Sequence, residues 1–401
     1  MFLLLWAGIG VDDDPGDLIL YFDYANHVDD GHVPYRDFQL EYPPLALVPI
    51  LLAFYPSNAV GGFFNGFEFL FALETYLLAL ASGLLAWSIM DRVLPTLRER
   101  ERRWRMVAYV AAYPLIGQIV TTRLDLLPTA LTVGAIALWL RRTERAEYSA
   151  WLLLAAGVAV KLSPIVVAPI FALDACRRRS LRCAVLGGLA FLGGITLFFV
   201  PGYLASPDGF IGVFTYHSAR GIQIESIYAN LTLWWSRVAD FDVDVIHAFG
   251  AFEASSVATP AIRTVSTLLQ LGTLASVYLT FLLATWRDAL ALRRDRLLVL
   301  GSLLALAAFI AFGKVFSPQY LIWLIPLVVL VPGRLGRWAI GVFLLTLVWT
   351  QVLFPYAYIA LLDNTVAGLV VLTYRNVLFL ALFVILMLAF ARQARGPAPV
   401  T

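Results

Sequence analysis

The stretch FFNGFEFLFALETYLLALASGLLAWSIM, residues 63–90, decides the fold class. Its only charged residues are Glu68 and Glu74. It is longer than the roughly 20 apolar residues that a helix needs to cross a bilayer. The residues that follow, 91–105, include six arginines. A long apolar run that ends in a basic cluster is typical of a membrane-spanning helix and its cytoplasmic end.

The composition of the whole chain agrees with this reading. Of the 401 residues, 61% are hydrophobic and 14% are charged. Soluble domains have about 45–50% apolar residues and about 25% charged residues. These values exclude a soluble globular enzyme, a disordered chain and a nucleic-acid-binding domain. We therefore expect an all-α polytopic membrane protein, in which residues 1–401 form one integral membrane domain with the lipid bilayer as its partner.

Apolar stretches recur between arginine clusters, and we expect about 10–12 crossings, several of them short. Residues 1–11 lack a basic start and a cleavage site, so we interpret them as part of a span rather than a signal peptide. Residues 43–56 contain four prolines and predict a membrane-surface or re-entrant segment. The expected spans are 1–11 (partial), 63–90, 106–120, 123–140, 150–160, 163–173, 184–201, 261–286, 297–313, 319–332, 337–356 and 376–391.

The arginines predict the orientation. Of 29 basic residues, 21 fall in alternate connections, which the positive-inside rule places in the cytoplasm: 91–105, 141–149, 174–183, 286–296, 332–337 and the tail after 391. We expect residues 392–401 to be a disordered cytoplasmic tail. The opposite face receives two long loops, the turns near 121, 161 and 314, and residues 357–375. The long loops are 12–62 and 202–260.

The first outward loop is acidic, and a fixed carboxylate there suits a general base. Asp17 precedes the apolar run LILYF, so helix N-capping is an alternative role for it. We interpret five other carboxylates of this loop as solvated surface charges: Asp12, Asp13, Asp14, Asp29 and Asp30.

Both lysines, Lys161 and Lys314, fall outside the cytoplasmic clusters. A lysine binds phosphate as a point charge and an arginine binds it bidentately. With Arg123, Arg220 and His217 they are candidates for an outward-facing phosphate site. Snorkelling of long side chains at helix ends is the alternative for each cation. Cys176 and Cys183 are interpreted as free thiols, and no metal motif is present.

Several motifs resemble glycosyltransferase family 87, the polyprenyl-phosphate-mannose-dependent mannosyltransferases of the GT-C superfamily. The first loop reads D-L-I-L-Y at 17–21, G-H-V-P-Y-R-D-F at 31–38 and E-Y-P-P at 41–44. Four further segments are similar to the same family, in the family's order: RLDLLPTALT at 123–132, GVAVKLSPIVVAPI at 157–170, SARGIQIES at 218–226 and FSPQYLIWLIPL at 316–327.

The resemblance implies a GT-C-like bundle whose extracytoplasmic loops form the active site, facing the periplasm or the cell exterior. The donor would be a polyprenyl-phosphate sugar, most simply mannose, and the acceptor a glycolipid or cell-wall glycan of a bacterium. The general base carries over to Asp17, with Asp37 and Glu41 as the next candidates. The resemblance assigns substrate positioning to Tyr21, Tyr35, Tyr42, Gln223 and Glu225. The mechanism requires no metal or other cofactor in principle.

Two other classes of membrane protein remain open. A secondary transporter would have inverted repeats and ionisable residues in broken helices near the membrane midplane. A lipid-linked glycan flippase, polymerase or ligase would also work at the outer face. The D-x-x-x-Y and E-Y-P-P motifs favour the transferase.

The orientation is testable with single cysteines in a background where Cys176 and Cys183 are replaced by serine. A cysteine at Asp208 is expected to react with an impermeant thiol reagent from outside, and one at Thr143 is not. Labelling of intact cells or right-side-out vesicles measures both. The reverse pattern would place the acidic loop in the cytoplasm and remove the outward-facing site.

Overall fold

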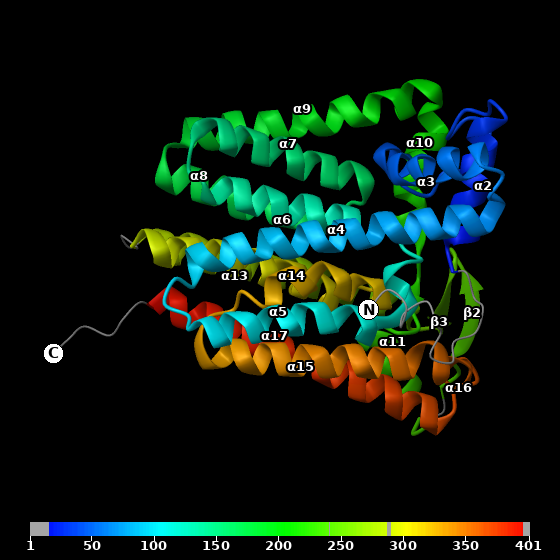
Figure 1. The fold of residues 1–401 in the computed structure, drawn as a ribbon. Coiled ribbons are helices and arrows are strands. Elements are labelled where there is room, and N and C mark those ends of the chain that lie inside the picture. The colour runs from blue at the N-terminus through cyan, green and yellow to red at the C-terminus, as the bar shows by residue number, and fades with distance from the viewer. Residues whose placement is uncertain (1–15, 240, 287–289, 396–401) are drawn as a thin grey trace. The chain divides into compact units, whose positions relative to one another are not determined.

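A computed structural model describes residues 16–239, 241–286 and 290–395, and Figure 1 shows the helical fold that they form. The chain divides into two compact units. The first contains the residues up to Ile89 and Gln118–Ser218. The second contains Met90–Gly117 and the residues from Ala219 onward. The single integral membrane domain expected from the sequence stays a prediction.

Six helical segments of the described chain are long and apolar enough to cross a membrane, and the multi-pass character is thereby supported. They are Phe63–Val93, Leu181–Ala205, Thr259–Trp286, Ala291–Phe312, Gly333–Tyr356 and Val366–Arg395. Shorter apolar segments span Pro44–Ala59, Leu126–Leu140 and Pro318–Val328. The expectation of about 10–12 crossings stays a prediction, and the part of it on residues 1–11 lies outside the described residues.

The first unit is helical, and α7 packs against both α6 and α9. Its elements are α2 (Leu18–Asp29), η1 (Pro44–Ala46), α3 (Leu47–Ala59), most of α4 (Phe63–Val93), η2 (Gly117–Val120), α6 (Leu126–Leu140), α7 (Glu144–Val160), η3 (Ser163–Val167), α8 (Ala168–Arg178), α9 (Leu181–Ala205) and α10 (Pro207–Ala219). The first loop therefore contains two helices, α2 and α3. A core of buried apolar and aromatic side chains joins them to Leu124 and Phe210.

In the second unit, α17 packs against both α13 and α15. The elements are α5 (Glu99–Ile116), β1 (Ile222–Gln223), α11 (Ile227–Trp235), β2 (Asp244–Ala248), β3 (Ala251–Ser255), α12 (Thr259–Trp286), α13 (Ala291–Phe312), η4 (Pro318–Leu324), α14 (Ile325–Val328), α15 (Gly333–Gln351), η5 (Val352–Tyr356), α16 (Tyr358–Leu362) and α17 (Val366–Arg395). The apolar window of α13 is 83% buried, against 22% for α12. Since both helices are apolar, α13 forms the core of this unit and α12 offers its surface to lipid.

A small antiparallel sheet in the second unit, of order β1-β3-β2, was not expected from the sequence. In the β2–β3 hairpin, Val245 pairs with Ala254, and the two-residue turn is Phe249-Gly250. Both turn residues have positive φ, 51° and 64°, the backbone that a tight hairpin of this kind requires. Most of the described chain is helical, as expected. The sheet lies within residues 202–260, which were expected to form a loop.

Three expected connections are wrong because helices continue into them. Residues 357–375 were expected to form a loop, but α17 begins at Val366. The basic connection 91–105 contains the first two turns of α5, and the tail expected from 392 is helical up to Arg395. The rest of that tail, 396–401, lies outside the described residues. In 91–105 and in the tail, charged residues hide the helix from an apolar pattern. Residues 366–374 carry no charge, and the expected span begins only at 376 because Arg375 interrupts the apolar run.

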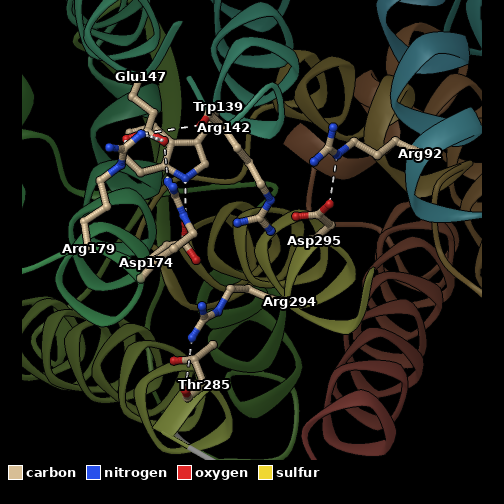
Figure 2. Close-up of polar contacts among 10 residues, drawn as sticks. Arg92, Trp139, Arg142, Glu147, Asp174, Arg179, Thr285, Arg294 and Asp295 are labelled. Atoms are coloured by element: carbon tan, nitrogen blue, oxygen red, sulfur yellow. Dashed lines mark hydrogen bonds and ion pairs between the residues drawn. The ribbon is translucent and has the colours of Figure 1, made fainter. Parts of the chain in front are cut away.

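Arginines at the ends of the helices are anchored by buried acceptors. In the first unit, Asp174 accepts from Nε1 of Trp139 at 2.8 Å and from Nε of Arg178 at 3.2 Å. Glu147 accepts from Nη2 of Arg178 at 2.6 Å and pairs with Nε of Arg179 at 2.9 Å. Figure 2 shows these contacts, which tie the start of α7 to the end of α8.

Arg105, which was expected in a connection between helices, has 0% exposure. Its Nη1 donates to the carbonyls of Val329 at 2.6 Å and Val331 at 2.8 Å, and its Nη2 pairs with Glu101 at 3.2 Å. These carbonyls follow α14, where the chain leaves a helix before α15 begins. Arg105 therefore satisfies backbone acceptors that the helical ladder leaves open.

Replacing Arg105 with methionine is expected to lower the free energy of unfolding by about 2–5 kcal/mol, because two buried carbonyls lose their donor. The matched control is Arg103→Met, since Arg103 is 75% exposed and pairs with the exposed Glu99. That surface pair is expected to contribute about 0–1 kcal/mol. Unfolding of the purified variants in detergent measures the difference, and equal losses would contradict the anchoring role.

Candidate functional site

The side chain of Asp17, at the start of α2, is the centre of a polar cluster in the first unit. Its Oδ2 accepts hydrogen bonds from the hydroxyls of Tyr21 and Tyr42, both at 3.3 Å. Its Oδ1 forms an ion pair with Nη1 of Arg123. Tyr21 follows Asp17 by four residues, so one helical turn brings them to the same face of α2. The cluster thus unites three residues singled out in the first loop with the predicted cation Arg123.

The alternative role of Asp17 as a helix cap is wrong. Asp17 occupies the N-cap position of α2, but its side chain makes no capping hydrogen bond. Gly16 precedes it with a φ of +58°, and an added Cβ there would lie 3.2 Å from the Thr122 side chain. This close approach brings the start of α2 against the turn that carries Arg123 and aims the carboxylate at the cluster.

The two tyrosines that contact Asp17 are held as hydrogen-bond donors. Burial raises the pKa of Tyr21 and of Tyr42 well above the usual value, and the nearby Asp17 carboxylate adds to both shifts. Each hydroxyl therefore keeps its proton at neutral pH. Tyr35 acts through the backbone, because its hydroxyl donates to the carbonyl of Tyr42 at 2.8 Å. Of the three tyrosines expected to position substrate, two contact the carboxylate and the third supports one of them.

Lys161 lies in a second ion pair of the first unit. Its Nζ donates to Oδ1 and Oδ2 of Asp125 at 2.9 and 2.8 Å, and the Asp125 side chain is fully buried. The Lys161 side chain is 16% exposed, so its ammonium is an internal group rather than a snorkelling one. The predicted phosphate role of Lys161 would require phosphate to compete with a bidentate carboxylate. Asp125 stands two residues after Arg123, so one turn supplies a member of each ion pair.

Asp37 and Glu41, the next candidates for the base, lie in different surroundings. Asp37 pairs with Nη2 of Arg36 at 2.9 Å and accepts from the backbone N–H of Val33 at 2.8 Å. The Arg36 guanidinium and the Val33 amide lower the pKa of Asp37 to about 2, which makes it a weak base. Glu41 is half-buried, and its backbone N–H contacts the Tyr24 hydroxyl at 3.5 Å. Among the described residues, Asp17 is the carboxylate with the most organised surroundings in this loop.

The remaining candidates for phosphate binding do not all lie in one unit: His217 is in the first, and Arg220 and Lys314 are in the second. His217 is half-buried on α10, where its ring contacts that of Tyr216 in the first unit. In the second unit, Nζ of Lys314 donates to the backbone carbonyl of Arg220 at 2.6 Å. Burial lowers the pKa of Lys314 to about 8, and the nearby Arg263 contributes in the same direction. Lys314 is therefore a cation at neutral pH that loses its charge in mildly alkaline solution.

Gln223 lies beside Lys314, which is about ninety residues away in the sequence, and Glu225 follows Gln223 by two residues. The backbone N–H of Gln223 donates to the Lys314 carbonyl at 3.0 Å, and both side chains are about 95% buried. Glu253 fixes the residue before β1, because its Oε1 accepts a hydrogen bond from the N–H of Gly221 at 2.8 Å. The motif SARGIQIES therefore begins at the exposed end of α10, and its residues 222–226 form a buried strand and turn, which the expectation of a loop did not include.

The sequence reasoning missed Arg375. This side chain is fully buried on α17, lies 3.8 Å from the Phe316 ring centroid and interacts electrostatically with Glu225. Among the residues that the structure describes, its Nε and Nη1 have no hydrogen-bond partner, and the side-chain amide of the neighbouring Asn376 has none either. An arginine inside an apolar run was the available signal, because such residues are rare and tend to be functional. Assigning 357–375 to a loop hid it.

The described residues contain no group of three or more His, Cys, Asp or Glu side chains that could hold a metal ion. The expectation that the reaction needs no metal stays a prediction. Comparison of the sequence with models of known protein families and with curated proteins finds no match. The functional argument therefore rests on the residues themselves and on their geometry.

The Asp125–Lys161 pair can be tested by a double-mutant cycle. Asp125→Asn leaves a buried ammonium unpaired, and Lys161→Met leaves a buried carboxylate unpaired, so each is expected to cost about 3–5 kcal/mol of stability. The double variant is expected to recover much of this loss. Thermal or denaturant unfolding in detergent measures the coupling. A stable Lys161→Met protein would instead free Lys161 for a phosphate role.

Proposed function

We propose that this protein is a membrane glycosyltransferase of the GT-C type, which transfers a sugar from a polyprenyl-phosphate donor to a glycolipid or glycan acceptor. Mannose is the proposed sugar, and the outer face of the membrane is the proposed location. The membrane-spanning helices support the part of this proposal that concerns a lipid-linked donor, since such a donor stays in the bilayer. The reaction itself is argued from Asp17.

The observation that carries the proposal is the setting of the Asp17 carboxylate. It lies outside the candidate spans, does not cap its helix and is oriented by Tyr21, Tyr42 and Arg123. The side chain is 30% exposed, so solvent and substrate can reach it. A carboxylate has about four lone-pair positions, and these three donors leave room for an acceptor hydroxyl. This is the arrangement that a positioned general base requires.

The proposed reaction is a single displacement. The acceptor oxygen forms a bond to the anomeric carbon while its proton passes to the Asp17 carboxylate. The bond between the anomeric carbon and the phosphate oxygen breaks, and polyprenyl phosphate leaves with the electron pair. Attack opposite to the leaving group inverts the anomeric configuration. Arg123 holds the Asp17 side chain in place, and Tyr21 and Tyr42 fix which oxygen faces the acceptor.

The donor phosphate needs cationic ligands, and the first unit offers two that are already paired. Arg123 is bound to Asp17, and Lys161 to Asp125. Both pairs are neutral overall, so their contribution to phosphate binding would be weaker than that of isolated cations. The phosphate role of Arg220, Lys314 and His217 stays a prediction from the sequence.

A transporter is the second candidate, and Arg375 is the observation that favours it. A fully buried arginine within a candidate span, next to an amide without partners, resembles the polar centres that mark substrate and ion pathways. No internal repeat is evident in the sequence to accompany it. The two candidates differ in outcome, because a transferase forms a new covalent bond and a transporter releases its substrate unchanged.

The first experiment supplies the purified protein with radiolabelled polyprenyl-phosphate-mannose and a membrane lipid extract. Label in a new glycolipid or glycan supports the transferase. Vesicles containing the protein and the same labelled donor provide the second readout. Label that crosses the membrane unmodified, with no new product, would favour transport.

Asp17→Asn is expected to lower turnover by about 10²–10⁴-fold, the contribution of a general base, because an amide cannot take the proton. Expression and donor binding are expected to fall less than turnover, since the amide oxygen can still accept hydrogen bonds from Tyr21, Tyr42 and Arg123 although the charge of the ion pair is lost. The matched control is Asp30→Asn at the other end of α2, an exposed carboxylate that should leave turnover unchanged. Normal turnover in Asp17→Asn would move the base to Glu41.

A further inference from the structure

A cavity of about 490 Å³ lies within the second unit, at the arginine-rich ends of its helices. Four segments that are distant in sequence line it: the connection into α5, the first turns of α13 and α15, and the end of α17. None of these segments carries a residue assigned to the proposed reaction. The cavity is therefore a separate feature of the molecule.

The lining carries a large excess of positive charge. Arg296, Arg334, Arg337 and Arg392 line the cavity, against one carboxylate, Glu101. Glu101 is already paired with Arg105 at 3.2 Å. Nε of Arg296 donates to the carbonyl of Val93 at 2.7 Å. Within the described chain, the other three arginines have no hydrogen-bond or ion-pair partner. Close like charges repel, so the counter-charge for this cluster has to come from a bound anion or from solvent.

The start of α15 adds backbone donors to the same cavity. α15 begins at Gly333 after Pro332, and no side chain caps it. Pro332, Gly333, Arg334 and Leu335 all line the cavity. The first N–H groups of a helix have no partner within the helix and carry partial positive charge. An anion in the cavity is thus offered both guanidinium groups and open amides.

Neighbouring contacts hold the cavity in shape without an occupant. Arg105 fixes the carbonyls of Val329 and Val331 ahead of α15. Arg293 donates to the carbonyls of Gln393, at 2.5 Å, and Ala394, and so closes the end of α17. Nε of Arg92 pairs with the buried Asp295 at 2.8 Å, as Figure 2 shows, and secures the start of α13. These contacts suit a preformed binding site.

We propose that this cavity binds the phosphate group of an anionic ligand. Guanidinium groups recognise phosphate bidentately, which a cluster of arginines does better than lysines. Apolar side chains of Leu94, Leu97 and Leu335 complete the lining, and the neighbouring Trp338 is 57% exposed. Exposed tryptophan at a helix end is typical of the membrane interface. Basic cavities between membrane helices on the cytoplasmic side bind anionic lipid headgroups, and the positive-inside rule predicts that side here.

The test compares two sources of phosphate on the full-length protein in detergent. In one arm, phosphatidylglycerol or phosphatidylcholine is titrated and retained lipid is counted by native mass spectrometry. In the other arm, inorganic phosphate is titrated and thermal unfolding is followed. A lipid headgroup predicts preferential retention of phosphatidylglycerol. A soluble phosphate compound predicts stabilisation by inorganic phosphate with no lipid preference. Either result supports a phosphate site.

The double variant Arg334→Gln/Arg337→Gln is expected to weaken the observed binding by at least about tenfold, since each charged hydrogen bond contributes about 1.5–3 kcal/mol. The matched control Arg100→Gln/Arg145→Gln removes the same charge from exposed positions that do not line the cavity. Equal weakening in both variants would show attraction by net charge alone and overturn the proposal. Absence of binding in both arms of the wild-type test would overturn it as well. Neither result bears on the transferase activity.

Discussion

The ion pair between Asp17 and Arg123 is the interaction on which the candidate site depends. It joins the start of α2 to the turn before α6, two segments that are about a hundred residues apart in the sequence. Around it, Tyr21 and Tyr42 donate to the second carboxylate oxygen. Without the pair, the first loop would lose its polar link to the helices of the first unit. The same pair holds the carboxylate in one orientation, which a positioned base requires.

The pairing of buried charges is a general constraint in this chain, because apolar surroundings make an isolated charge costly. Asp125 holds Lys161, Asp174 binds Trp139 and Arg178, and Arg105 binds two backbone carbonyls. Arg375 departs from this pattern, since two of its guanidinium nitrogens have no hydrogen-bond partner among the described residues. Departures of this kind are where a polar ligand has the most to gain.

Much of the fold could be predicted from the sequence, because a membrane span is recorded locally as a run of apolar residues. Residues 63–90 appear in the structure as α4, and the Asp17–Tyr21 spacing matches one helical turn. Contacts between distant segments leave no such local record. Nothing in the sequence pairs Arg123 with Asp17, or Lys161 with Asp125, so these cations were interpreted as phosphate ligands without their partners.

Charged residues within helices were the other source of error. Arg105 and Arg375 were taken for loop residues because hydropathy falls wherever an arginine stands. Both side chains are instead buried inside the second unit, so neither arginine is a surface loop residue. The small sheet was missed for a similar reason, because strands of two to five residues are too short to give a clear alternating pattern.

The most direct test of the account is the anomeric configuration of the product. The purified protein would be given a polyprenyl-phosphate sugar of known anomeric configuration, and the transferred sugar would be analysed by nuclear magnetic resonance. A single displacement with Asp17 as base predicts inversion at the anomeric carbon. Retention would contradict the account, because it requires either a covalent intermediate or attack from the leaving-group side.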